Sequence, residues 1–196
     1  MHRIFATCLE TGIASVVLIP LFWLLHRRYF QNTARTACCL VLSLYLAAVD
    51  AVVGLPCLLY VRFDTNVNLV PFAYMFSDYR SSLLNVLLFL PLGLLLPMLW
   101  KPFLSFFRTA LLGLLFSLAI ELLQLFTRRA TDINDLMTNT LGTILGWCVG
   151  RLVLKLFPRI VPGEDLRELA VVFGVSFGVM FFIQPFFAEL VWRFLR

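Results

Sequence analysis

The sequence predicts an all-α fold, a polytopic transmembrane helix bundle of about six spans. Among its 196 residues, 61% are hydrophobic and 14% are charged, which is too apolar for an ordinary soluble domain. Six apolar stretches approach the length of about 20 residues that a helix needs to cross a hydrocarbon core of about 30 Å. No polar stretch is long enough to bury a core of its own, so we expect one bundle without a separate soluble domain.

The expected spans follow one another along the whole chain. The first resembles a signal peptide, but no small-residue cleavage motif follows it, so we expect it to remain as a span. The fourth and fifth are joined by so few residues that they must form a tight antiparallel hairpin. In the third, Pro91 is expected to kink the helix. The six spans are Ala6–His26, Ala37–Val61, Leu83–Trp100, Leu104–Phe126, Ile133–Phe157 and Leu169–Trp192.

The two longest polar connections divide the chain into three parts. Residues 1–65 are expected to form an N-terminal two-helix segment, and residues 66–157 a core of three helices with an outer loop. Residues 158–196 supply a connection and the last helix. All five cysteines lie in apolar stretches, so we expect them to act as small hydrophobic side chains and not as a disulfide framework.

Basic residues predict the orientation of the helices. Nine Lys and Arg residues lie in the first, third and fifth connections or in the span ends beside them, against seven elsewhere. Because cytoplasmic loops are enriched in basic residues, we expect both termini and the connections 62–82 and 127–132 to lie outside. The net charge of +5 fits a basic cytoplasmic rim, and no Lys/Arg cluster is dense enough to predict nucleic-acid binding.

A cluster of polar residues interrupts the apolar sequence where the fourth span ends and the fifth begins. A charged side chain in hydrocarbon costs at least a few kcal/mol unless it is paired or hydrated, so such a cluster is expected to be functional. Its three carboxylates and two guanidinium groups favour a ligand-binding site near the water interface. A salt-bridge network that fixes helix register is the structural alternative. The cluster consists of Glu121, Gln124, Arg128, Arg129, Asp132, Asp135 and Asn139.

Glycines recur every four residues in the fifth span, at Gly142, Gly146 and Gly150. Such a series permits the close approach of two helix backbones. We expect it to pack against a neighbour inside the bundle, and Gly174 and Gly178 of the last span offer one matching surface. A homodimer through the same glycine face is the alternative.

Three polar residues lie apart from the cluster, within other spans. Asn85 is expected to bond a neighbouring helix or to face the polar site. Glu10 and Asp50 either belong to the same site or pair with one another.

The residue types restrict the chemistry. The two histidines, His2 and His26, lie at the edges of the first span, which argues against phosphohistidine chemistry and against histidine-ligated metal sites. No resident metal or other cofactor is therefore expected. Carboxylate chemistry remains as an alternative, and only under it would Glu121, Asp132 and Asp135 hold Mg²⁺ on a lipid diphosphate.

Five short motifs follow one another between residues 66 and 150. They are Asn68-Leu-Val-Pro71-Phe72, Asn85-xxx-Phe89-x-Pro91-x-Gly93, Glu121-xx-Gln124, Arg129-xx-Asp132-Ile133-x-Asp135 and Asn139-x-Leu141-Gly142-xxx-Gly146. Together they resemble the VanZ-like family of bacterial membrane proteins. The family is named for a protein that accompanies glycopeptide resistance and raises tolerance to teicoplanin-type drugs. Asn134 departs from the pattern, because the family often has a second aspartate there, and this weakens the case for a doubled-carboxylate metal site.

The resemblance implies a multi-pass protein of the bacterial cytoplasmic membrane and cell envelope, with membrane lipids as partners. Our first hypothesis is that its outer polar site engages a lipid-linked cell-wall precursor or a lipoglycopeptide, with Arg129 meeting phosphate. The residues expected to bind this ligand are Asn68, Asn85, Gln124, Arg128, Arg129 and Asn139.

Two alternatives stay open, so the sequence does not decide whether the protein is an enzyme. One is an intramembrane enzyme acting on an isoprenoid phosphate, with Glu121 or Asp135 as general base and Mg²⁺ as counter-ion; Asp132 is the third candidate catalytic residue. The other is an ion or proton pathway through Glu10, Asp50 and Glu121.

Overall fold

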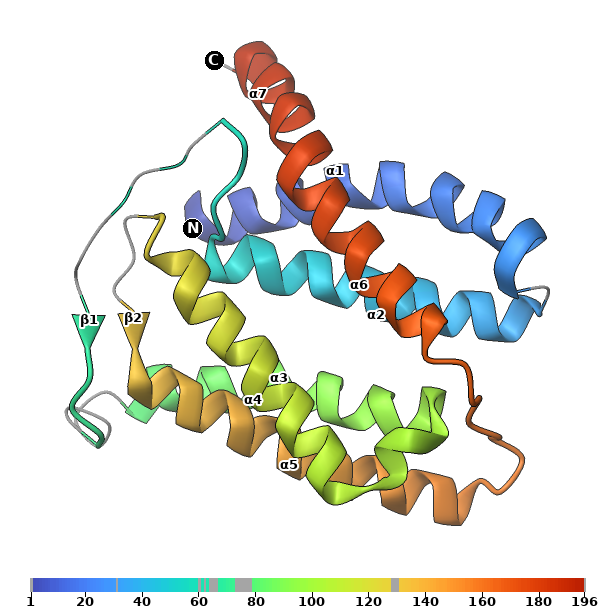
Figure 1. Cartoon of the computed structure of the whole chain (residues 1–196). Coiled ribbons are helices and arrows are strands. Elements are labelled where there is room, and N and C mark those ends of the chain that lie inside the picture. The colour runs from blue at the N-terminus through green and yellow to red at the C-terminus, as the bar shows by residue number, and fades with distance from the viewer. Residues whose placement is uncertain are drawn as a thin grey trace. The chain divides into compact units, whose positions relative to one another are not determined.

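The computed structural model describes residues 2–30, 32–59, 61, 63, 67–72, 79–127 and 131–195. Within these ranges the chain is mostly helical, which confirms the predicted all-α class (Figure 1). The α-helices are α1 (His2–Leu25), α2 (Thr33–Val53), α3 (Tyr79–Leu99), α4 (Phe106–Gln124), α5 (Ile133–Leu156), α6 (Arg167–Gly178) and α7 (Gln184–Leu195). Two π-helical turns, His26–Phe30 and Val179–Ile183, extend α1 and join α6 to α7.

Five helical segments of the described chain are long and apolar enough to cross a membrane. They are Phe5–Phe30, Thr33–Val53, Tyr79–Leu99, Phe106–Gln124 and Arg167–Phe194. Helix α5 begins at Ile133, as expected of the fifth span, but it is not in this set because residues such as Asn139 and Lys155 lower its hydropathy. The helices therefore confirm a multi-pass membrane protein.

Glycine and proline have different effects on the helix bounds. The expected second span, Ala37–Val61, is too long, because α2 ends at Val53. Gly54 adopts the left-handed conformation with φ of 64°, its N–H bonds the carbonyl of Asp50 at 2.7 Å, and a proline follows two residues later. Glycine takes this conformation without steric cost, so it ends the helix. By contrast, α3 continues as one helix through both of its prolines.

The chain folds as two compact units. The central unit is Phe63–Asp165 and contains α3, α4, α5 and two short strands. The terminal unit combines Met1–Arg62 with Leu166–Arg196, and so contains α1, α2, α6 and α7.

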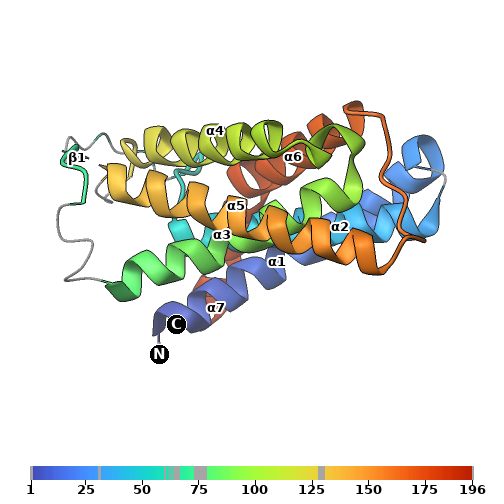
Figure 2. The ribbon, with the colours of Figure 1, turned by 90° about the horizontal axis from the view of Figure 1, so that it is seen from below.

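In the central unit, α3 and α5 run parallel with their backbones in close contact (Figure 2). A Cβ atom on Gly142 would collide with the carbonyl of Val86, and one on Gly146 with the carbonyl of Leu90. A Cβ on Gly150 would lie 2.7 Å from the carbonyl oxygen of Leu94. The glycine series therefore packs inside the chain, as expected.

The expected glycine partner in the last span is wrong. A Cβ atom added at Gly174 or Gly178 would meet nothing within 4 Å, whereas the glycine face of α5 is filled by α3. A homodimer through this face would therefore require α3 to move away.

Helix α4 completes the central unit by packing antiparallel to α5, as the expected hairpin requires. Near the middle, the buried Thr143 lies against Gly93 of α3 and Gly113 of α4. Toward the polar end, Asn139 Nδ2 donates a hydrogen bond to Ser117 Oγ at 2.9 Å. Small residues thus let three helices meet at one level, and the amide-hydroxyl bond fixes their register.

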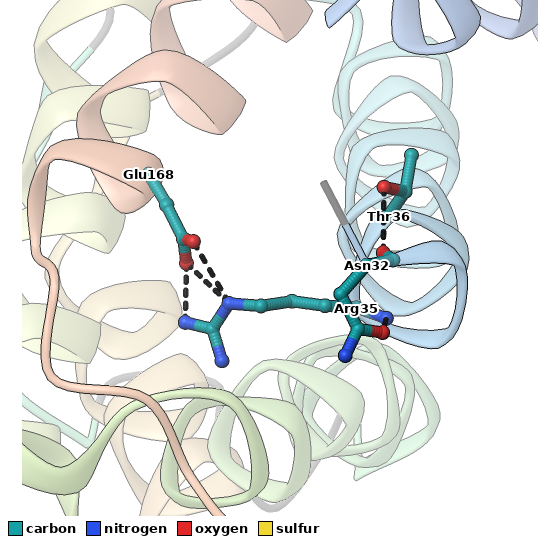
Figure 3. A network of polar contacts seen from close by, with 4 residues as sticks. All are labelled: Asn32, Arg35, Thr36 and Glu168. Carbon is teal, nitrogen blue, oxygen red and sulfur yellow. Dashed lines mark hydrogen bonds and ion pairs between the residues drawn. The ribbon is translucent and has the colours of Figure 1, made fainter. Parts of the chain in front are cut away.

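In the terminal unit, an ion pair ties α6 to α2 (Figure 3). Arg35 Nε donates to both carboxylate oxygens of Glu168, at 2.8 Å and 2.7 Å, and its Nη2 contacts the same carboxylate. Asn32 caps α2 by accepting a hydrogen bond from the Arg35 backbone at 3.1 Å. The side chains of Arg35 and Glu168 are 20% and 11% exposed, so removing one partner would leave a charge with little water around it.

We expect Gly146→Leu to prevent folding, because its side chain would overlap the backbone of α3 at Leu90. The matched control is Gly174→Leu, whose Cβ meets open space. The yield of monodisperse protein after detergent extraction should fall sharply for the first variant and stay near wild type for the second. Equal yields for both variants would contradict the close contact of α3 with α5.

Candidate functional site

Two short parallel strands bring distant parts of the central unit together. Strand β1 (Val67–Asn68) pairs with β2 (Thr131–Asp132), so that Asn68 lies opposite Asp132 (Figure 1). Because β2 leads directly into α5, the pairing attaches the segment before α3 to the N-terminus of α5.

Asp132 is the centre of a hydrogen-bond network at this point. It is the N-cap of α5, with extended φ and ψ of −130° and 123°. Its Oδ1 accepts hydrogen bonds from the backbone N–H of Asn134 at 2.8 Å and from the Asn134 side-chain amide at 2.9 Å. A third hydrogen bond arrives from Asn68 Nδ2 at 3.1 Å. One oxygen therefore caps a helix and joins two strands.

Glu121 connects the last turns of α4 to the same network. It is 4% exposed, and its Oε2 accepts a hydrogen bond from the backbone N–H of Asp132 at 2.9 Å. Its own carbonyl accepts a hydrogen bond from Thr131 Oγ1 at 3.0 Å. Asp135 is also close enough for its charge to act on Glu121. Three carboxylates therefore gather at one end of the central unit.

Two carboxylate oxygens of this network, one from Glu121 and one from Asp132, can still accept hydrogen bonds. Among the described residues, no donor bonds Glu121 Oε1 or Asp132 Oδ2, although the other oxygen of each carboxylate is occupied. A carboxylate oxygen can accept two hydrogen bonds, so these atoms can receive donors from a ligand or from water.

Asn134 was not predicted as a site residue, yet it organises the loop that faces the network. Its Oδ1 accepts a hydrogen bond from the backbone N–H of Phe72 at 2.6 Å, and Phe72 has a positive φ of 62°. Its Nδ2 donates to Asp132, as described above. An aspartate here would lose that donor and would place a second carboxylate against Asp132. The only signal of this role in the sequence was the position of Asn134, two residues after the helix cap Asp132.

Further from this end, the polar strip continues with amides. Gln124 is 3% exposed and Asn139 is 3% exposed, on α4 and α5 respectively. Among the described residues, Asn139 Oδ1 and Asn85 Nδ2 are buried without a hydrogen-bond partner. The bond expected from Asn85 to a neighbouring helix is therefore not made through its Nδ2.

The structure brings together only part of the predicted site. Asn68, Glu121 and Asp132 share one network, whereas Glu10 and Asp50 belong to the terminal unit. Arg128 and Arg129 lie outside the described residues, so their predicted pairing with the carboxylates stays a prediction. Across the described ranges, no group of three or more His, Cys, Asp and Glu side chains is arranged to hold a metal ion.

Comparison with known proteins identifies the family. The sequence family described as VanZ/LLP1 matches residues 38–155, more than half of the chain. The chain belongs to the VanZ/LLP1 family. Protein VanZ of Enterococcus faecium is 39% identical over 82 residues, which cover 41% of this chain and 50% of that relative. The chain thus aligns with half the length of this relative, and no solved structure matches it.

The VanZ/LLP1 match covers the helices of the central unit and part of α2. It runs from within α2 to the last turn of α5. It therefore includes every residue of the Asp132 network, which we define as Asn68, Glu121, Asp132, Asn134 and Asp135. Helices α1, α6 and α7 lie outside it. The part shared with the family is therefore the part that holds the three carboxylates.

We expect Asp132→Ala to lower the stability of the protein by about 1–2 kcal/mol, because α5 loses its N-cap. Asp132→Asn should stay close to wild type, since asparagine caps helices about as well as aspartate. Thermal unfolding in detergent measures both. Equal losses for the two variants would show that the charge of Asp132, and not its capping, stabilises the fold.

Proposed function

We propose that this VanZ/LLP1 protein lies in the bacterial cytoplasmic membrane and engages a lipid-linked headgroup or a lipoglycopeptide at the outer face. Through this binding it contributes to resistance against glycopeptides of the teicoplanin type. The observation that supports the proposal is the Asp132 network, which holds three carboxylates at one end of the central unit with two oxygens available.

The chemistry of the network suits a ligand with many hydrogen-bond donors. Glu121 Oε1 and Asp132 Oδ2 accept hydrogen bonds, and the hydroxyl groups of sugars and the N–H groups of peptides donate them. Hydrogen bonds to ionised groups are about twice as strong as neutral ones. A phosphate on the same ligand needs a cation, and we assign that role to Arg129, which lies outside the described residues.

The charge distribution of the central unit supports the outer position of the network. Because α3 and α5 run parallel, the residues that follow α3 and the last turns of α5 lie far from Asp132. That end carries Lys101, Arg151 and Lys155. Lys101 Nζ donates to Glu164 at 2.6 Å, and this hydrogen bond lowers the pKa of Glu164. Basic residues favour the cytoplasmic face, so the Asp132 end is assigned to the outside.

Thiol labelling tests this orientation. In a background without native cysteines, a cysteine at Leu69 should react with an impermeant thiol reagent in intact cells, whereas one at Phe157 should react only after lysis. Both positions are exposed, 69% and 59% respectively, so the protein itself shields neither one from the reagent. The reverse pattern would place the Asp132 network inside and contradict the proposal.

The magnesium-dependent enzyme is the second candidate, and the geometry favours it less. Asp132 Oδ1 is already occupied by three N–H donors, and the carboxylates of the described residues are not grouped as metal ligands. For the ion pathway, the candidate residues Glu10 and Asp50 lie in the terminal unit and Glu121 lies in the central unit. If the resistance required both added Mg²⁺ and the carboxylate of Glu121 as a general base, the enzyme hypothesis would be favoured instead.

The function is tested by removing charge while keeping shape. Glu121→Gln and Asp135→Asn should leave thermal unfolding near wild type but return the inhibitory concentration of teicoplanin to that of cells without the protein. The reason is that a carboxamide oxygen still accepts a hydrogen bond, but a neutral one that is weaker.

The matched control is Glu164→Gln, the same chemical change on a side chain that is 78% exposed at the other end of the central unit. This variant should keep full resistance. If Glu121→Gln and Asp135→Asn also keep full resistance, the carboxylates are structural and the proposed binding site is wrong.

A further inference from the structure

The terminal unit contains a cavity that is lined only by residues of that unit. Its volume is about 400 Å³, within the range of about 300–1,000 Å³ that is usual for small-molecule sites. It is enclosed by α1, the C-terminal end of α2 with the residues that follow, and α7. The lining residues that carry the argument are Glu10, Asp50, Cys57, Gln184, Glu189 and Trp192.

The cavity has an excess of negative groups. Glu10 and Asp50 face it from neighbouring helices and are close enough for their charges to interact. The Asp50 carboxylate accepts a hydrogen bond from the backbone N–H of Leu55. Within the described chain, neither carboxylate is in an ion pair. Two carboxylates therefore face the cavity without a cation.

The basic residue that lines the cavity does not neutralise them. Arg193 Nη2 is bonded to Glu189 Oε1 at 2.5 Å, one turn earlier on α7. The lining therefore offers three carboxylates against one guanidinium, and the guanidinium is already paired. A cation from outside the chain would restore the balance.

Gln184 adds a polar group to the cavity from another helix. Its side chain lines the cavity and the residue is only 7% exposed. No residue of the described chain forms a hydrogen bond with this side-chain amide. The Gln184 amide therefore offers hydrogen-bonding groups to a polar ligand beside the two carboxylates.

The rest of the lining is apolar. Trp192 belongs to it, together with Met180, Pro185 and Ala188. The Trp192 ring packs edge to face with Phe5, with centroids 6.3 Å apart, which holds its orientation. An indole face attracts ammonium groups and also covers hydrocarbon. The cavity therefore combines anionic acceptors with an apolar wall.

We propose that this cavity binds a primary organic ammonium ion that carries an apolar substituent. The ammonium has three N–H donors, and the carboxylates of Glu10 and Asp50 with the amide oxygen of Gln184 provide three acceptors. The apolar substituent lies against Trp192. The ammonium comes either from the headgroup of a membrane aminolipid or from a free amphiphilic amine, and both have the same chemistry at this site.

Cys57 is a natural reporter because it lines the cavity. In protein whose other four cysteines are alanine, reconstituted in nanodiscs of phosphatidylglycerol, aminoethyl methanethiosulfonate is compared with its sulfonatoethyl analogue. After correction for the rates of both reagents with a small thiol, the ammonium reagent should modify Cys57 about tenfold faster, equivalent to about 1.4 kcal/mol. Hexylamine should protect Cys57, and hexanol, which has the same chain without the charge, should not.

Two variants identify the groups responsible. The double variant Glu10→Gln with Asp50→Asn should lose both the preference for the ammonium reagent and the protection by hexylamine. Glu164→Gln, in the central unit, should keep both. If the double variant fails to fold in a thermal-unfolding check, Ala188→Leu replaces it, because a larger side chain there fills the cavity and should abolish protection by hexylamine. Equal corrected rates, or protection by hexanol equal to that by hexylamine, would overturn the proposal.

Changing the lipid of the nanodiscs distinguishes the two sources of the ammonium group. If an aminolipid is the occupant, nanodiscs that contain phosphatidylethanolamine should protect Cys57 without added amine. If a free amine is the occupant, hexylamine should protect Cys57 equally in both kinds of nanodisc. Either outcome supports an ammonium site, whereas absence of protection by both the lipid and hexylamine would refute it.

Discussion

The close backbone contact between α3 and α5 is the constraint on which the central unit depends. Where Gly142 and Gly146 face α3, any side chain would collide with a carbonyl of the neighbouring helix. The two helices can approach this closely only because glycine has no side chain. Attraction between helices in a membrane comes mainly from such packing, since lipid tails are as apolar as the helices. The contact sets the position of α5, and therefore of the Asp132 network at its N-terminus.

The Asp132 network stabilises the fold with some of its oxygen atoms and leaves others for further donors. One oxygen of Asp132 caps α5 and holds β1 to β2, while one oxygen of Glu121 accepts the backbone N–H of Asp132. Each carboxylate thereby keeps a second oxygen for other donors. The structural and functional interpretations of the polar cluster are thus compatible, because they use different atoms of the same side chains.

The two units carry different chemistry. The central unit contains most of the VanZ/LLP1 match and concentrates its carboxylates beside backbone N–H donors at one end. The terminal unit is held by the Arg35–Glu168 pair and encloses an acidic cavity built largely from helices outside that match. We therefore expect a function shared with relatives to depend on the central unit. The cavity is formed largely by helices outside the family match, so we do not expect relatives to share it on the basis of that match.

The sequence by itself determined the helical membrane class, the family and the membership of Glu121 and Asp132 in one polar cluster, because hydropathy and local polar motifs are properties of neighbouring residues. It did not determine the end of α2, where left-handed Gly54 overrides an apolar run, or the role of Asn134. Only the tertiary structure showed that the glycines of α5 face α3, and that Glu10 and Asp50 line one cavity. The physical reason is that helix pairing and cavities depend on which faces meet, and periodicity identifies a face without identifying its partner.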